Sequence, residues 1–534
     1  MKKYLYLLKP NLKSLIFLGF SIILYRAVYL ISFFVDAVLI DTIAVTSSVN
    51  DLINITLIYA FFVFAVIVLR HINNITQQKL SIKIAYTFKE TVINHLQKID
   101  LLKYKKFDPI YLSKRTDDDT LQFATFFVEN YVQMFITGIE IIVVLIILFG
   151  INIYMGIYSV IVLPFFIFVS ILFKKPLRQR NLEYVEQSAI FFKDYAYQFQ
   201  NMEQILIDSN LENEKIFFKS SFSVFYNKFK RNINIKHGFL NLSALLGDAI
   251  GIVIFFIGGL GVINGLNTIG ETVVSGFFFH NVIVNIKYYM NLNQSIQTTK
   301  ASLIRLDEIF DIPKLEAGNL KIQEIFKIDV HIKNFNIEDR SILRDFKFSA
   351  KKGEIIGILG KNGTGKSTFS KMLIGLIKPE NEDDIQIKFN EDHNIFDLDT
   401  VHTRNSNISY VPQVISFKDI KLSELFAEFE KPSCFLDKLK KVAFLNDEIE
   451  NIVNENWDKN LNDLSGGNKQ AIFILKNILE NKNVLIFDEP TSNLDVSKIV
   501  WFKELIRCYK KNKIIFIITH EESILDTLDK SIFF

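Results

Sequence analysis

Several short stretches in the second half of the chain hold residues whose types and spacing suit phosphate chemistry. The first, GKNGTGKST (360–368), follows the apolar run EIIGIL and precedes a segment with helical spacing. Glycines in such a loop allow backbone N–H groups to surround a phosphate, and the following helix start adds a favourable dipole. We predict that Lys366 holds the β- and γ-phosphates and that the Ser367 hydroxyl binds Mg²⁺. The predicted nucleotide contacts are Gly360, Asn362, Gly363, Thr364, Gly365, Lys366, Ser367 and Thr368.

Two apolar strands end in residues that suit hydrolysis. VLIFDEP (484–490) ends in two carboxylates, of which Asp488 suits the magnesium shell and Glu489 suits general-base work on the attacking water. KIIFIITH ends in His520, which we expect to contact the γ-phosphate. Taken singly, each of these residues could have a structural role instead of a catalytic one, because acidic strand ends and structural histidines are common. Their order after the glycine loop favours the catalytic interpretation.

A second helix start also suits a phosphate. LSGGNKQ (464–470) places Ser465, Gly466 and Gly467 at the beginning of an apolar helix, with close access to the backbone. One nucleotide in one subunit needs a single such helix start. The pair therefore predicts a nucleotide held between two copies of the chain.

The surrounding sequence predicts the elements that would position these residues. From about residue 325 onward, short β-rich runs alternate with amphipathic stretches, which is typical of a parallel α/β domain. A charged stretch over 311–324 that contains Pro313 reads as a linker. We expect an α/β domain over 325–534.

The first 310 residues are typical of a membrane domain. Lysine and arginine are absent from three long gaps, each about twice the ~20 residues that one membrane helix needs, and each is split near its middle by a polar or glycine-containing patch. The basic residues between the gaps place the intervening segments and both termini in the cytoplasm. We therefore predict six membrane helices with long cytoplasmic extensions, at roughly 15–45, 52–70, 121–149, 155–173, 239–263 and 270–290.

Composition excludes other classes. The chain is 49% hydrophobic, which suits a protein that is partly membrane and partly water-soluble. Its net charge of +3 gives no sign of a nucleic-acid partner. The two cysteines form no CxxC pair, which argues against a disulfide framework or a zinc site.

With these motifs in this order, the chain resembles the ATP-binding cassette (ABC) exporter family, as a half-transporter with one membrane domain fused to one nucleotide-binding domain. YVPQ with Gln413 and SNLD with Asp495 match two further family motifs. The resemblance implies that Gln413 serves catalysis and the metal, and that Asp495 serves the nucleotide. It also implies an all-α six-helix membrane domain before an α/β P-loop NTPase domain, ATP and Mg²⁺ as cofactors, a homodimer surrounded by lipid, and a bacterial inner-membrane location with a cytoplasmic ATPase domain.

The resemblance extends into the membrane half and has departures. FDPIYLSKRTDDDTLQF (107–123) resembles the first segment that couples exporter membrane helices to the ATPase domain. Where the family usually has an aromatic residue that stacks on adenine, this chain has Ile337, with Phe335 as the substitute aromatic. Asn468 replaces the usual glutamine of the signature motif. Only about a dozen residues precede the first helix, so we expect no leader-cleaving peptidase domain.

The sequence specifies the transported molecule less closely than it specifies the ATPase chemistry. Charges inside membrane spans usually face a bundle interior or an aqueous cavity, although several can snorkel or pair with one another. We expect an outward-moving amphipathic cargo, with a peptide or drug-like cation favoured because the predicted cavity is acidic on balance. A lipid or lipid-linked-glycan flippase and a non-transporting gate or sensor remain alternatives. The residues concerned are Arg26, Asp36, Glu129, Glu140, Asp248, His280 and Lys287.

Overall fold

The chain forms two compact units. A computed structural model describes residues 2–534 apart from 46–47, 108, 209–210, 316–317, 338–339, 362, 379–383, 391–392, 417, 430 and 443. Unit 1 comprises Met1–Ile93 and Pro109–Phe310, and unit 2 comprises Asn94–Asp108 and Asp311–Phe534. The sequence predicts one contiguous domain over 1–310, so the assignment of Asn94–Asp108 to unit 2 differs from that prediction.

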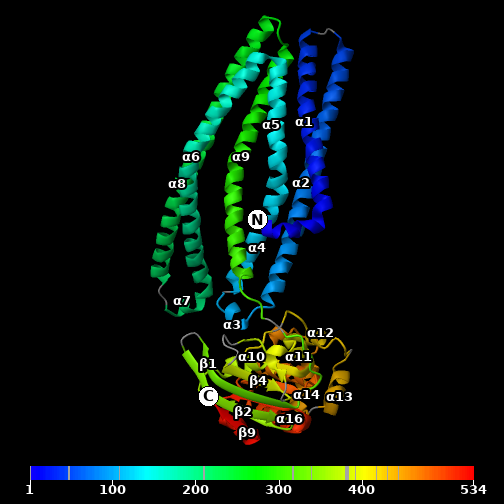
Figure 1. Ribbon diagram of the computed structural model, residues 1–534, viewed down its shortest axis with the longest axis vertical. Helices are drawn as coiled ribbons and strands as arrows, with labels where there is room; N and C mark the ends of the chain where they lie inside the picture. Colours follow the sequence, from blue (N-terminus) through cyan, green and yellow to red (C-terminus); the bar gives the residue numbers. More distant parts are fainter. Residues whose placement is uncertain are drawn as a thin grey trace. The chain divides into compact units, whose positions relative to one another are not determined.

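Unit 1 is all-helical in its described residues. Its long helices run beside one another, with α6 against α8, α1 against α9 and α5 against both α6 and α9 (Figure 1). A π-helical turn, η2, joins α4 to α5. The elements are η1 (Lys2–Asn11), α1 (Leu12–Val45), α2 (Val49–Leu96), α4 (Pro109–Thr125), η2 (Phe126–Tyr131), α5 (Val132–Ile151), α6 (Ile153–Gln200), α7 (Met202–Asp208), α8 (Leu211–Ile263) and α9 (Ile269–Phe310).

Five helical stretches of the described residues are long and apolar enough to cross a membrane. They are Lys3–Ala44, Val49–Leu96, Arg115–Ile151, Leu211–Ile263 and Ile269–Tyr289. The remaining predicted span, 155–173, falls on α6, where a shorter apolar stretch covers Ile153–Phe165. The sixth crossing therefore stays a prediction.

Two charges of α1 have partners on other helices. The Arg26 guanidinium lies 3.3 Å from the carboxylate of Glu140 on α5, and the Glu140 side chain is 2% exposed. Near the end of α1, Asp41 accepts hydrogen bonds from the Thr268 hydroxyl at 2.6 Å and from the Gly270 N–H at 2.7 Å. A carboxylate at the start of α9 satisfies N–H groups that have no partner within the helix. Both charges thus fix α1 to its neighbours.

Removing one partner of the Arg26–Glu140 pair is expected to destabilise the protein. In Arg26→Ala the buried Glu140 loses its charged partner, at a cost of roughly 1–3 kcal/mol. A lower thermal-unfolding midpoint in detergent would show this loss. The double variant Arg26→Met/Glu140→Leu removes both charges and should recover part of the stability, so a double variant no better than Arg26→Ala would contradict a role through charge pairing.

Unit 2 is built around two sheets. The five-stranded sheet is parallel in the order β6-β7-β8-β3-β9, and the four-stranded sheet is antiparallel in the order β2-β1-β4-β5. The strands are β1 (Lys327–Ile337), β2 (Arg340–Lys351), β3 (Ile355–Leu359), β4 (Ile385–Phe389), β5 (His393–Asn394), β6 (Ile408–Val411), β7 (Val484–Asp488), β8 (Ile514–Thr519) and β9 (Lys530–Phe533). This order agrees with the predicted parallel α/β class.

Apart from α3, which precedes all the strands, the helices of unit 2 lie between these strands in the chain (Figure 1). They are α3 (Leu101–Tyr104), α10 (Lys366–Leu373), η4 (Ile395–Asp397), α11 (Thr400–Asn407), α12 (Leu422–Leu425), α13 (Pro432–Val442), α14 (Asp447–Asn456), η5 (Leu461–Asp463), α15 (Gly466–Leu479), α16 (Val496–Tyr509), η6 (Lys510–Asn512) and η7 (Glu522–Thr527).

The parallel sheet is the middle layer of unit 2. Its strands β3, β7 and β8 are buried along their whole length and apolar except at the terminal Asp488 and Thr519, because successive side chains alternate between two cores. On β7, Leu485 and Phe487 join the core with α15 and α16. Val484 and Ile486 face the core that contains α10 and the antiparallel sheet. This rigid central layer positions the strand ends that carry Asp488 and His520.

The segment Asn94–Asp108 joins unit 2 through backbone hydrogen bonds. The Leu101 N–H donates to the Leu376 carbonyl at 3.1 Å, and the Leu315 N–H donates to the Lys98 carbonyl at 2.7 Å. The buried Asp100 carboxylate accepts from the N–H of Leu102 at the start of α3 and from the N–H of Lys378 at 2.8 Å. This segment of unit 2 therefore lies upstream of most of 107–123, and α4 belongs to unit 1.

Candidate phosphate and hydrolysis site

The glycine loop has a conformation that suits a phosphate. Gly363 and Gly365 have φ angles of 82° and 96°, and Gly365 caps α10 in the left-handed region. Such turns direct consecutive N–H groups to one side. Lys366 is 6% exposed, and its ammonium group donates to the carbonyls of Gly360 and Lys361 at 2.8 Å. The lysine charge is thus held within the loop.

Other predicted loop residues have local roles. The Thr364 hydroxyl donates to the Lys361 carbonyl at 2.9 Å, which closes the turn, and Thr368 lies in the first turn of α10. Asn362 lies outside the described residues, and the side chains of Phe335 and Ile337, the predicted adenine contacts, are not described either.

Asp488 is a point of contact between three elements. Its Oδ1 accepts from the Ser367 hydroxyl on α10 at 3.0 Å, and its Oδ2 accepts from the Tyr410 hydroxyl on β6 at 2.7 Å. Asp488 itself is 2% exposed. Burial, followed by the nearby Asp488 charge, raises the pKa of Tyr410 above its usual range. Tyr410 was not among the site residues predicted from the sequence, although it precedes Gln413 in the same YVPQ motif.

The donor set around Ser367 and Asp488 fits Mg²⁺. Hydroxyl and carboxylate oxygens are the hard ligands that this ion prefers, together with water and substrate phosphates. The structure brings these two predicted metal ligands into direct contact. The third, Gln413, donates to Glu489 instead of contacting this pair in the described hydrogen bonds.

Glu489 lies between the two other predicted catalytic residues. The Gln413 amide donates to its Oε2 at 2.8 Å, and His520 Nδ1 lies 3.3 Å from its Oε1. Glu489 has a φ of 49°, a left-handed conformation that costs a non-glycine residue about 1 kcal/mol or more. The N–H of Glu489 donates to the Ile518 carbonyl at 2.9 Å, which helps to hold this conformation at the end of β7. The strained turn directs the carboxylate toward Gln413 and His520.

The predicted signature residues lie at the start of α15. The Ser465 hydroxyl caps this helix by accepting from the Asn468 N–H at 3.3 Å. A side chain at Gly467 would come within 2.7 Å of the Asn493 carbonyl, so only glycine fits there without a shift. Among the described residues, no hydrogen bond links Ser465, Gly466 or Gly467 to the glycine loop.

Asp495 caps the next helix, α16. It accepts from the N–H of Lys498 at 3.0 Å and pairs with the Lys498 ammonium. This ammonium group, with the neighbouring donors, lowers the pKa of Asp495 to about 2. Lys498 also lies 3.1 Å from Glu448 on α14, so the loop after Glu489 is tied to the helical layer.

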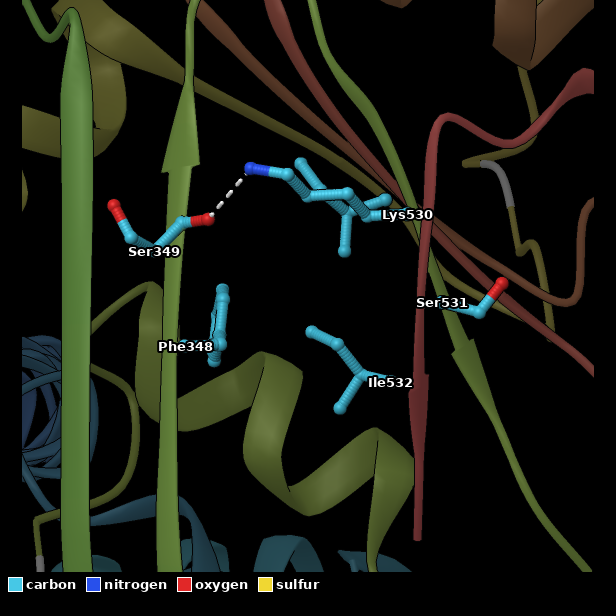
Figure 2. Close-up of a pocket in the computed structure, with 6 residues that line it drawn as sticks. Phe348, Ser349, Lys530, Ser531 and Ile532 are labelled. Carbon is cyan, nitrogen blue, oxygen red and sulfur yellow. Dashed lines mark hydrogen bonds between the residues drawn. The ribbon is translucent and has the colours of Figure 1, made fainter.

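Two cavities of unit 2 differ in their relation to these residues. One, of about 340 Å³, is lined by Gly360, Lys361, Thr519 and His520 among others, and so adjoins the glycine loop. The other, of about 460 Å³, lies between β2 and β9, where the Lys530 ammonium donates to the Ser349 carbonyl at 3.3 Å (Figure 2). No predicted site residue lines this second cavity.

Comparisons with known families agree with the two-part organisation. The family model for the ABC transporter transmembrane region matches residues 15–286, and the ABC transporter model matches residues 343–492. A putative multidrug export ATP-binding/permease protein of Staphylococcus aureus is 25% identical over 520 residues, which cover 94% of this chain and 88% of that protein. The pediocin PA-1 transport/processing ATP-binding protein PedD of Pediococcus acidilactici is 26% identical over 402 residues, which cover 71% of this chain and 53% of PedD.

The chain spans about half the length of several such relatives, 44% and 53% in two cases. Among solved structures, a bacterial Atm1-family ABC exporter with ATP bound aligns with a TM-score of 0.80 at 17% identity. The alignment covers 98% of this chain and 94% of that one, which establishes the fold over both units taken together.

Proposed function

Because this chain belongs to the ABC transporter family, with its transmembrane region and its ATP-binding domain in one polypeptide, we propose that it is an ATP-driven exporter. The proposal rests mainly on three side-chain contacts at the end of β7. Asp488 meets Ser367 there, and Glu489 meets Gln413 and His520. These are the groups that ATP hydrolysis needs, held by the rigid parallel sheet.

The residues divide the work of hydrolysis. Lys366 and the loop N–H groups would bind the β- and γ-phosphates, while Ser367 and Asp488 would hold Mg²⁺, which supplies neutralisation of phosphate charge. Glu489 would accept the proton of the water whose oxygen attacks the γ-phosphorus, as ADP leaves. Gln413 and His520 orient the Glu489 carboxylate through their contacts with it.

A homodimer in a bacterial inner membrane, with the ATPase domain in the cytoplasm, completes this proposal. Two observations support a second copy. The signature residues have no hydrogen bond to the glycine loop among the described residues, so they are available to a nucleotide held by another copy. In addition, the most apolar stretch of α2 is 0% buried, so this helix needs lipid or a partner chain to cover it.

The remaining membrane charges favour a cationic or amphipathic cargo, with a peptide as one candidate. Arg26 and Glu140 cancel each other, which leaves one base, Lys287, and three acids, Asp36, Glu129 and Asp248, among the charged residues named for the predicted spans. Asp248 is exposed and the other two are partly exposed. The names of two relatives, one for pediocin transport and processing and one for multidrug export, agree with cargo of this kind.

ATPase activity of the full chain in liposomes tests the function. We expect ATP hydrolysis that cationic peptides or drug-like cations stimulate. Stimulation by anionic lipids or lipid-linked glycans alone would favour a flippase, and activity without stimulation by any of these would favour a gate or sensor. A full chain that neither binds nor hydrolyses ATP would refute the proposal.

Asp100→Ala is expected to weaken coupling while leaving basal ATPase activity intact. Asp100 bonds both the α3 start and the Lys378 N–H, so its loss removes one of the contacts that hold Asn94–Asp108 in unit 2, at a cost of roughly 1–3 kcal/mol. The measurement compares basal with cargo-stimulated turnover, and Asp118→Ala, an exposed acid on α4, is the control. Equal stimulation of Asp100→Ala and wild type would contradict this role.

A further inference from the structure

Tyr410 belongs to the YVPQ motif, but the role assigned to that motif concerns Gln413 and does not explain Tyr410. It lies on β6, which pairs with β7 so that Tyr410 stands opposite Ile486. Alternation along β6 turns Ser409 toward α15, where it contacts Asn477, and turns Tyr410 toward α10. The Tyr410 hydroxyl therefore reaches the same face of the sheet as Ser367.

The contacts of Tyr410 are directed at the carboxylate of Asp488. The hydroxyl donates to Oδ2 at 2.7 Å, while Ser367 donates to Oδ1 at 3.0 Å. A third side chain supports the arrangement, because Ser370 Oγ lies 3.4 Å from the Tyr410 hydroxyl and donates to the Ser367 carbonyl at 3.0 Å. Each carboxylate oxygen thus has one donor, and rotation of the carboxylate about its last bond would break both bonds.

The pattern is that of an outer partner which orients a metal ligand. Hydrogen bonds from such partners fix the plane of a ligating carboxylate and leave one oxygen directed at the metal position. Here the phenol occupies Oδ2, and Oδ1 stays beside the Ser367 hydroxyl, the other predicted ligand. A half-buried tyrosine that merely satisfied its hydroxyl could use any carbonyl, as Tyr509 does with the Ile478 backbone at 2.8 Å and the Asn481 side chain at 3.0 Å.

We propose that Tyr410 is a positioning residue for the magnesium site, which orients Asp488 so that Oδ1 and the Ser367 hydroxyl bind the ion together. This inference rests on the proposed ATP site. It predicts that Tyr410 contributes to the binding of MgATP and not to the binding of metal-free ATP, which depends on Lys366 and the loop N–H groups.

The test compares ATP affinity with and without magnesium. The full chain carries Glu489→Gln to prevent turnover, and ATP binding in lipid nanodiscs is measured in MgCl₂ and in EDTA. Tyr410→Phe should weaken MgATP binding about 10–100-fold and leave metal-free ATP binding unchanged. Tyr509→Phe removes a different half-buried hydroxyl and is the matched control, with no change in either condition, while Asp488→Asn marks the complete loss of the magnesium-dependent gain.

The outcomes separate the two proposals. MgATP affinity of Tyr410→Phe equal to that of the parent would overturn the positioning role and leave the ATP site intact. Equal losses with and without magnesium would make Tyr410 a purely structural residue and also overturn it. Absence of ATP binding in the parent protein under both conditions would overturn the proposed function itself.

Discussion

Glu489→Gln is expected to retain ATP binding and lose nearly all ATP turnover. The amide keeps the size of the carboxylate but cannot accept a proton from water, and loss of a general base lowers rates by about 10²–10⁴-fold. ATP would then stay bound between two closed ATPase domains. Single-turnover hydrolysis and the amount of nucleotide that stays bound after gel filtration measure the two effects.

Glu522→Gln is the matched control for this variant. Glu522 is an exposed acid of η7, in the loop that follows His520, so the same chemical change there should leave turnover at the wild-type rate. Wild-type turnover in Glu489→Gln would remove Glu489 from the role of base. Loss of ATP binding in that variant would instead indicate that the carboxylate helps to hold the local structure.

Lys366→Ala is expected to lower the affinity for ATP at least about 30-fold. The ammonium group is buried in the loop, and truncating one partner of a buried charge pair costs about 2–5 kcal/mol, of which 2 kcal/mol corresponds to about 30-fold in affinity. Because Lys366 also bonds two loop carbonyls, Lys366→Met should be measured beside it, as methionine keeps the apolar stem in place. Isothermal titration with ATP in the presence and absence of magnesium gives the affinities.

A surface lysine controls for the change of net charge. Lys511 is exposed in η6, and Lys511→Ala should bind ATP as the wild type does. The expected loss for Lys366 should occur in both metal conditions, which distinguishes it from the magnesium-dependent loss expected for Tyr410→Phe. Unchanged ATP affinity in Lys366→Ala would contradict the assignment of the glycine loop as the phosphate site.

Local patterns predicted three strands of unit 2 and two helix breaks of unit 1 well. The runs around Ile355–Leu359, Val484–Asp488 and Ile514–Thr519 are apolar except for the terminal Asp488 and Thr519, which is what a parallel strand covered on both faces requires. The breaks at Asn152 and after Ile263 fall where polar patches split the apolar gaps. These features depend on residues that are neighbours in the sequence, so the sequence pattern is enough to predict them.

Contacts between distant residues were harder to predict. The sequence shows that Arg26 and Glu140 are charged, but only the structure shows that they pair with each other. Likewise, the resemblance of 107–123 to a coupling segment gave no signal for the contact that Asn94–Asp108 makes with the rest of unit 2. That contact depends on backbone groups, which every residue type shares, and composition therefore gives no signal for it.

By itself the sequence determined the chemical groups of this protein, because the motifs specify residue types in a fixed order and the basic-residue gaps specify apolar length. Only the tertiary structure decided which groups meet. It brought Ser367 and Tyr410 to opposite oxygens of Asp488, and it held Glu489 in a left-handed turn between Gln413 and His520. The physical reason is that strand pairing and side-chain alternation place residues far apart in the chain at one edge of the sheet.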